Sequence, residues 1–162
     1  MNWQWTQDGA HTVEFTAGYP VYGSTANFTN DAVATVQIRR AELVKSLLIG
    51  GAEVTLSFNI PLEGIVDAMV NISNQNEVFP AEGDAPVTVT IDTKSRFFSR
   101  TEPGSQLLIS CAGGIDTNSV RFTSTRKDAG TFRYGPPTKN GMPTELWLDV
   151  EAAPYGFKVI IR

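Results

Sequence analysis

The chain has 162 residues, of which 41% are hydrophobic, 10% aromatic and 19% charged, and this composition predicts one globular β domain over residues 1–162. Its formal net charge of −4 argues against general binding to nucleic acid or to an anionic membrane. The single cysteine, Cys111, excludes an internal disulfide and a thiolate metal cluster, and no apolar run approaches the roughly 20 residues of a membrane span.

Alternation of apolar and polar residues with a period of two predicts strands along most of the chain. The clearest example is Glu53–Ile60, which Pro61 ends because proline cannot donate a ladder hydrogen bond. Short strands separated by turn signals are typical of an antiparallel sandwich or barrel. In chain order, the predicted strands are His11–Thr16, Val33–Arg39, Glu53–Ile60, Val87–Ile91, Leu107–Cys111, Val120–Thr125, Gly130–Tyr134, Leu146–Val150 and Phe157–Ile161.

Two stretches have some helical character. Ala41–Leu48 fits either a short helix or a bulged strand, and Gly64–Val70, which follows Pro61, fits one or two helical turns. The expected fold class is therefore all-β, an antiparallel sandwich or barrel with one or two short helical turns. In the strand that ends at Cys111, alternation places Leu107, Ile109 and Cys111 on one face, so we expect the cysteine to be a buried small apolar residue.

The sequence lacks the residues that most catalytic chemistry needs. His11 is the only histidine, so neither a hydrolytic triad nor a zinc site can be assembled in the usual way. The phosphate-binding glycine patterns are also absent. Two carboxylate pairs, Asp149 with Glu151 and Glu82 with Asp84, could serve a glycosidase, although solvated surface carboxylates are commoner. We therefore expect no enzyme activity, no catalytic residues, no metal and no cofactor.

Aromatic residues are concentrated near the N-terminus. Trp3, Trp5, Tyr19 and Tyr22 lie among glutamine, glycine and threonine residues. Such rings serve as anchors in assembly interfaces and as stacking platforms in carbohydrate-binding sites. A third interpretation is a strand packed over the sheets. We take these four residues as candidate interface residues.

A second candidate interface is basic and lies in the last third of the chain. Its positive side chains alternate with aromatic ones, which resembles a groove for single-stranded nucleic acid. Because the net charge is negative, we interpret the cluster as a charged face for a protein partner. The candidate interface residues here are Arg121, Arg126, Lys127 and Arg133, and the aromatic residues between them are Phe122, Phe132 and Tyr134.

Charge is distributed unevenly along the chain. Residues 1–90 hold ten acids and three bases, a net −7, whereas residues 91–162 hold seven acids and ten bases, a net +3. This difference either disappears when the two halves interleave in the fold or creates complementary faces that attract copies or partners.

Several segments together resemble the N-terminal β-domain of baseplate-hub and tail-tip proteins of long-tailed bacteriophages and gene transfer agents. The resemblance covers about residues 36–135. The matching segments are the Arg-rich strand Ile38–Leu43, the strand Glu53–Pro61 with its terminal proline, the short apolar segment Leu62–Val70, the Val/Thr strand Val87–Ile91, the strand Leu108–Cys111 and the basic segment Thr125–Tyr134.

The resemblance implies a structural protein of a phage tail tip or baseplate that acts through assembly. Its partners would be other virion proteins and copies of itself, with no nucleic acid and no membrane. The N-terminus lacks the basic and apolar regions of a secretion signal, so we expect synthesis in the host bacterial cytoplasm and incorporation into the virion. The alternatives are a capsid or decoration protein with a jelly-roll fold and a carbohydrate-binding module.

Overall fold

The computed structural model describes residues 11–14, 25–28, 33–51, 53–123 and 130–153. This part of the chain is nearly all β, and its one helical turn is the 3-10 turn η1 (Phe97–Ser99). The strands are β1 (His11–Glu14), β2 (Thr25–Asn27), β3 (Val33–Ile38), β4 (Glu42–Val44), β5 (Ser46–Leu48), β6 (Glu53–Phe58), β7 (Val70–Ile72), β8 (Val87–Ile91), β9 (Gly104–Cys111), β10 (Val120–Thr123), β11 (Thr131–Tyr134), β12 (Pro137–Lys139), β13 (Met142–Pro143) and β14 (Glu145–Val150).

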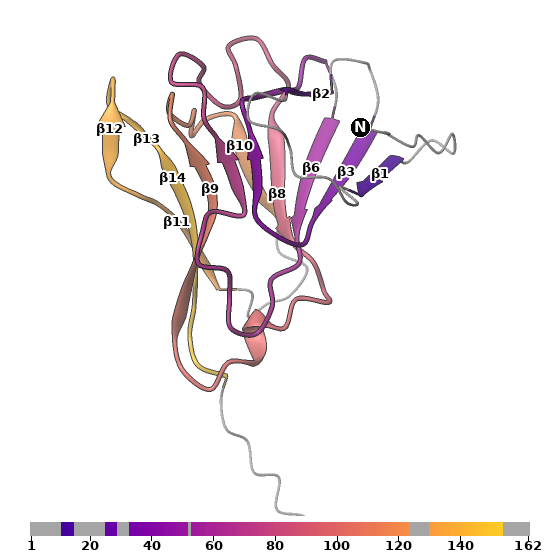
Figure 1. Ribbon diagram of the computed structural model, residues 1–162, viewed down its shortest axis with the longest axis vertical. Helices are drawn as coiled ribbons and strands as arrows, with labels where there is room; N and C mark the ends of the chain where they lie inside the picture. The colour runs from indigo at the N-terminus through magenta and orange to yellow at the C-terminus, as the bar shows by residue number, and fades with distance from the viewer. Residues whose placement is uncertain (1–10, 15–24, 29–32, 52, 124–129, 154–162) are drawn as a thin grey trace, which may run out of the picture.

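One sheet of five strands, which we call the parallel sheet, has the order β1-β3-β6-β8-β10. Every neighbouring pair in it is parallel, and the strands follow one another in chain order (Figure 1). The register places residues of the same type beside one another: Thr35, Thr55 and Thr88 form one row across the sheet. Val36, Leu56 and Val89 form the adjacent row on the opposite face.

A second sheet of five strands, which we call the mixed sheet, has the order β11-β14-β9-β7-β4. Its β4, β7 and β9 are mutually parallel, and β14 and β11 are added in antiparallel fashion. A third face holds the parallel pair β2-β5 and a parallel bridge between Phe79 and Ile115.

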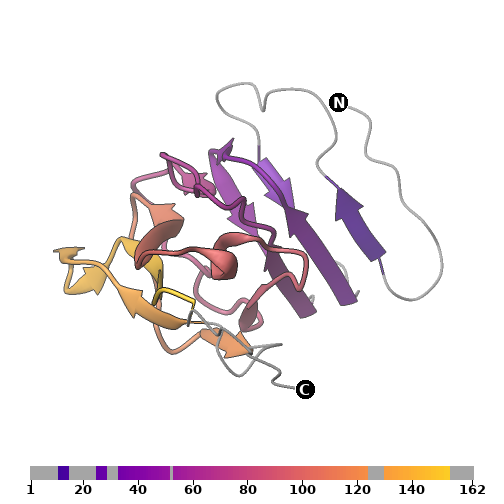
Figure 2. The same ribbon diagram turned by 90° about the horizontal axis from the view of Figure 1, so that it is seen from below.

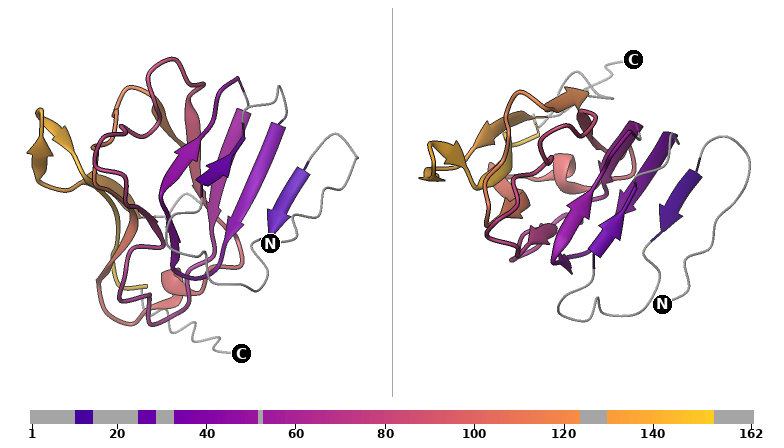
Figure 3. Two further views of the ribbon diagram at one scale, coloured as in Figure 1. Left: turned by 45° about the horizontal axis from the view of Figure 1, so that its top comes forward. Right: turned by 90° about the horizontal axis from the view of Figure 1, so that it is seen from above.

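The chain visits these three faces repeatedly in one order. It passes from β2 to β3 to β4, then from β5 to β6 to β7, then from Phe79 to β8 to β9, and then from Ile115 to β10. Each passage adds one parallel strand beside its predecessor, so the chain winds as in a parallel β-helix. Figures 2 and 3 show the N-terminal strands on one side of the molecule and the β12-β13 hairpin on the opposite side.

The expected strands that lie within the described residues are present, whereas Phe157–Ile161 lies outside those residues. The expected antiparallel arrangement is wrong for most of the strands that are described. Antiparallel pairing is confined to β9-β14, β14-β11 and β12-β13 within the described residues. Alternation suggested exposed sheets, and exposed sheets are usually antiparallel, since the crossovers of parallel sheets normally cover both faces. Here the connections return through the other faces of the winding, so the outer face of the parallel sheet can stay polar.

Alternate residues of β3, β8 and β14 point into a single core. In β3 the inward side chains are Ala34, Val36 and Ile38, all buried. In β14 the expected inward residues Leu146, Leu148 and Val150 are buried, as alternation predicted. Both sheets and the third face contribute to one hydrophobic cluster, which therefore joins the turns of the winding.

Three local expectations are corrected. Residues 41–48 form β4 and β5 with a bend between them, so the strand interpretation holds there and the helical one is wrong. The segment Gly64–Val70 has no helical turn, because residues 64–69 form a loop and Val70 begins β7. The buried side chain of Gln106 holds this loop in part, since it accepts from the Ile65 amide at 2.6 Å. Leu107 leaves the face shared by Ile109 and Cys111, because the β9-β14 register shifts between Leu146 and Trp147.

Candidate interface at the last turn

The last turn of the winding ends in two strands that lack an outer neighbour among the described residues. β10 is the final strand of the parallel sheet, and β11 is the final strand of the mixed sheet. The unpaired edge of such a strand presents backbone N–H and C=O groups that can pair with another chain. We call this end of the molecule the last-turn end.

An aromatic cluster lies between these two strands. Phe122 of β10 and Phe132 of β11 are stacked, with ring centroids 4.5 Å apart. Tyr134 of β11 lies 6.1 Å from Phe122 in a tilted arrangement. Phe132 and Tyr134 pair with the buried Leu148 and Leu146 of β14 and pack against the core.

Phe122 belongs to the inward side of its sheet but is not buried. Its register partner is Val89, which in turn pairs with Leu56, and both are fully buried. Phe122 itself is 38% exposed, whereas Val120 of the same strand is buried, and no further strand covers the Phe122 ring within the described residues. The apolar interior therefore reaches the surface at the last-turn end.

The hydroxyl of Tyr134 is also part of this end. Its oxygen is buried and has no hydrogen-bond partner in the described part of the chain. Burial raises the pKa of Tyr134, and the negative charge of Asp116 raises it further. The cluster is therefore held together mainly by ring contacts and not by polar ones.

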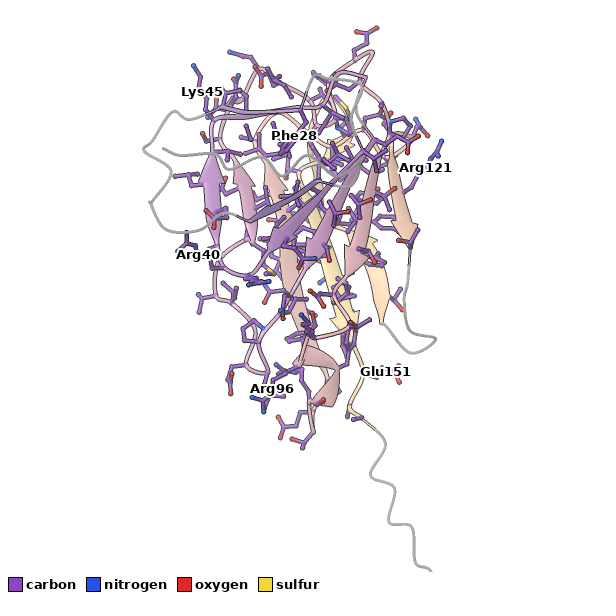
Figure 4. The ribbon with its side chains drawn as sticks, turned by 90° about the vertical axis from the view of Figure 1, so that its right-hand side faces the viewer. Phe28, Arg40, Lys45, Arg96, Arg121 and Glu151 are labelled. Atoms are coloured by element: carbon purple, nitrogen blue, oxygen red, sulfur yellow. The ribbon has the colours of Figure 1, made fainter. Side chains whose placement is uncertain are left out.

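Arg121 and Arg133, both predicted as interface residues, are placed on different sheets. Arg121 is exposed on the outer face of the parallel sheet, in the row of Thr88, and Figure 4 shows it on the side opposite to Arg40 and Lys45. Arg133 points outward from the mixed sheet, where it pairs with Asp149. The alternation of basic and aromatic residues thus places the rings between the sheets and the cations outside.

Arg133 takes part in a polar network on the outer face of the mixed sheet. Its guanidinium lies 5.0 Å from the centre of the Trp147 ring, whose Nε1 donates to Glu145 at 2.8 Å. Asp149 also accepts a hydrogen bond from Ser105. These groups satisfy one another and fix the β11-β14-β9 part of the sheet.

The two carboxylate pairs considered for catalysis have structural surroundings. Asp149 is held by Arg133 and Ser105, and Glu151 is exposed just after β14. Asp84 accepts from the backbone amides of Ile49 at 3.2 Å, Gly50 at 2.8 Å and Ala81 at 3.3 Å, while Glu82 is exposed.

Six of the predicted interface residues lie outside the described residues, namely Trp3, Trp5, Tyr19, Tyr22, Arg126 and Lys127. Phe122, Phe132 and Tyr134 had been noted only as neighbours of the basic residues. The signal that could have identified them is their period-two position, which makes them inward residues of terminal strands.

Cys111 is fully buried, as predicted, and burial raises the pKa of its thiol. In the ranges that the structure describes there is no group of three or more His, Cys, Asp and Glu side chains that could hold a metal ion. None of the described residues forms a helix long and apolar enough to cross a membrane.

Comparison with known proteins gave no match, whether to family models, to curated proteins or to solved structures.

Proposed function

We propose that this protein is a virion structural protein of a bacterial virus, located at the tail tip or baseplate, and that it acts by assembly through its last-turn end. The observation that carries the assembly role is Phe122, an inward residue of the parallel sheet that is 38% exposed, on a strand edge that no described residue pairs with. The ring belongs to a cluster with Phe132 and Tyr134, and apolar clusters that reach the surface beside polar residues are typical of protein–protein interaction sites.

The polar groups near this end also favour binding over catalysis. Arg133, Asp149 and Ser105 are engaged with one another, so they fix a rigid surface. Rigid elements are suited to holding a docking surface in one geometry. The location in a tail rests on the resemblance of residues 36–135 to baseplate-hub and tail-tip proteins.

The structure weakens one alternative and leaves the other without a described site. A jelly roll is built from antiparallel sheets, whereas the parallel sheet here has five parallel strands. The carbohydrate-binding alternative depended on Trp3, Trp5, Tyr19 and Tyr22, which lie outside the described residues.

The test is to locate the protein in particles released by the bacterium that encodes it. An antibody raised against the purified chain would be applied to these particles and visualised by immunogold electron microscopy. We expect gold at one end of the tail, with pre-immune serum as the control. Gold on the head would indicate a capsid or decoration protein instead. Particles without label, with the protein retained in the cells, would contradict the virion proposal.

A further inference from the structure

At each end of the winding, one of the two sheets extends one strand beyond the other, and it is a different sheet at each end. At the first turn, β3 leads directly into β4, so the parallel sheet extends one strand further than the mixed sheet, and that strand is β1. At the last turn, β10 adds to β8 and β14 adds to β9, and the mixed sheet then extends one strand further, with β11. One end therefore protrudes where the other recedes.

Strand number and direction are also compatible with continuation. Both sheets have five strands. A second copy displaced along the winding by five strand spacings, about 24 Å, would therefore continue both sheets at once. Two successive antiparallel pairings make β11 run in the same direction as β9, β7 and β4. A displaced copy would thus place its β1 beside β10 and its β4 beside β11, both in parallel pairing.

We infer that a second copy of this chain docks on the last-turn end in this head-to-tail arrangement, so that the parallel sheet continues from β10 of one copy into β1 of the next. The inference rests on the proposed function, because it names the partner for the proposed docking surface. Such a contact is open, since each added copy exposes a new last-turn end.

The rows of the parallel sheet support this occupant. One row runs from Val13 through Val36, Leu56 and Val89 to Phe122. If the row continues into the next copy, the Val13 position of that copy lies beside Phe122, so the exposed ring has an apolar residue as its neighbour. The free energy gained comes from covering apolar surface and from pairing two unsatisfied strand edges.

Charge distinguishes this arrangement from a symmetric dimer. By backbone register, Arg121 lies in the row that ends in Thr12, and Glu14 stands two residues further along β1. A head-to-tail neighbour therefore places the Glu14 position diagonally across from Arg121, and opposite charges at diagonal positions of adjacent strands attract. A two-fold dimer through β10 would instead bring Arg121 near its own copy, and like charges at this distance repel.

The experiment is sedimentation velocity of the full chain over a range of concentrations, at low and high salt. The variants are Arg121→Glu, Glu14→Arg and the two combined. Arg96→Glu makes the same charge change at an exposed position before η1, away from both ends, and serves as the control. Phe122→Ser tests the apolar contact, with Val33→Ser as its control because Val33 is 51% exposed at the start of β3.

We expect wild type to form a series of species that grows with concentration. Each single charge reversal should weaken association roughly fivefold or more, and the double variant should restore it. Phe122→Ser should weaken association too, whereas both controls should behave as wild type. Circular dichroism of each variant verifies that its strands are intact.

Three outcomes would overturn the inference: a monomer at every concentration, a dimer that does not grow, or association unaffected by Arg121→Glu. The immunogold experiment tests the virion location, and its result does not depend on whether the chain docks on itself. Gold at the tail tip with a monomeric chain would retain the virion role and remove self-docking. Assemblies that grow with concentration, formed by a chain that is absent from the particles, would retain self-docking and remove the virion role.

Discussion

The second and last turns of the winding place apolar residues in the same row but bury them to different degrees. Leu56 and Val89 are 1% and 0% exposed, whereas Phe122, one strand further, is 38% exposed. All three point inward, and Phe122 is the largest. The exposure is confined to the end of this row, because Val120 of the same edge strand is only 6% exposed, although the described residues supply no strand beyond β10.

At the first turn, by contrast, the apolar residues of the third face are buried. Ala26 and Phe28 of the third face are 2% and 7% exposed, and they pack with Val36 of the parallel sheet. Between the first two turns lies a small cavity of about 20 Å³ with an apolar lining that includes Val44 and Val70. The first turn therefore leaves a small cavity in the core, whereas the last turn leaves an apolar ring partly exposed.

The largest expected effect is at a close backbone approach in the inner turns. A Cβ at Gly113 would lie 1.8 Å from the carbonyl oxygen of Glu77, which is backbone and cannot rotate away. We expect Gly113→Ala to lower the free energy of unfolding by about 4 kcal/mol or to prevent folding. Urea denaturation followed by circular dichroism measures this.

Gly83→Ala is the matched control for that substitution. Gly83 has φ +86, and nothing lies within 4 Å of the added Cβ, so only backbone strain of about 1–2 kcal/mol is expected. Equal losses for the two variants would show that the inner turns are not tightly stacked.

The next prediction compares how much Leu56 and Phe122, which lie in the same row of the parallel sheet, contribute to the free energy of unfolding. Leu56→Ala should cost about 2–5 kcal/mol of unfolding free energy, because it leaves a cavity between packed turns. Phe122→Ala should cost clearly less, about 1 kcal/mol, because its ring is already 38% exposed. Chemical denaturation of both variants, at a concentration where the chain is monomeric, tests this. A larger loss for Phe122→Ala would contradict the view that the last turn is open.

Alkaline pH should weaken the fold through groups whose pKa is raised. Burial raises the pKa of Cys111 and of Tyr134, so the unfolded chain ionises before the folded one. Their contribution is complete below the ordinary pKa values, near 9 for the thiol, and declines as the pH rises above them. Denaturation from pH 7 to 11 should give a shallower decline in Cys111→Ala than in wild type. Parallel curves would show that the thiol ionises equally in both states.

The smallest expected effect is a gain in the first turn. Val70→Ile adds one methylene beside the cavity and should raise the free energy of unfolding by about 0.5–1 kcal/mol. Thermal unfolding measures this gain, with Val150→Ile, away from the cavity, as the control. A loss at Val70 would mean that the cavity cannot accept the added methylene.

The sequence predicted where strands lie better than how they pair. Alternation located Val87–Ile91 with its observed bounds and predicted Glu53–Ile60, of which β6 covers Glu53–Phe58, because inward residues there are apolar and outward ones mostly polar. The short strands β4, β5 and β7 span three residues each, too few for alternation to be recognised. Strand direction could not be predicted, because alternation is the same for a parallel strand with an uncovered outer face.

The candidate site was predicted in part. Arg121 and Arg133 lie on the two strands at the last-turn end, but on separate outer faces. Phe122, Phe132 and Tyr134 come together only because the chain passes from one sheet to the other between β10 and β11. Such a contact depends on the three-dimensional path of the chain, which period-two patterns do not specify.

The most direct test of the last-turn end as a docking surface is hydrogen–deuterium exchange of residues 120–123 at low and high protein concentration. The account predicts at least tenfold slower exchange of these β10 amides in the concentrated sample, while β8, which is paired on both sides, changes little. Exchange of β10 at one rate at every concentration, while the chain associates through another region, would contradict it.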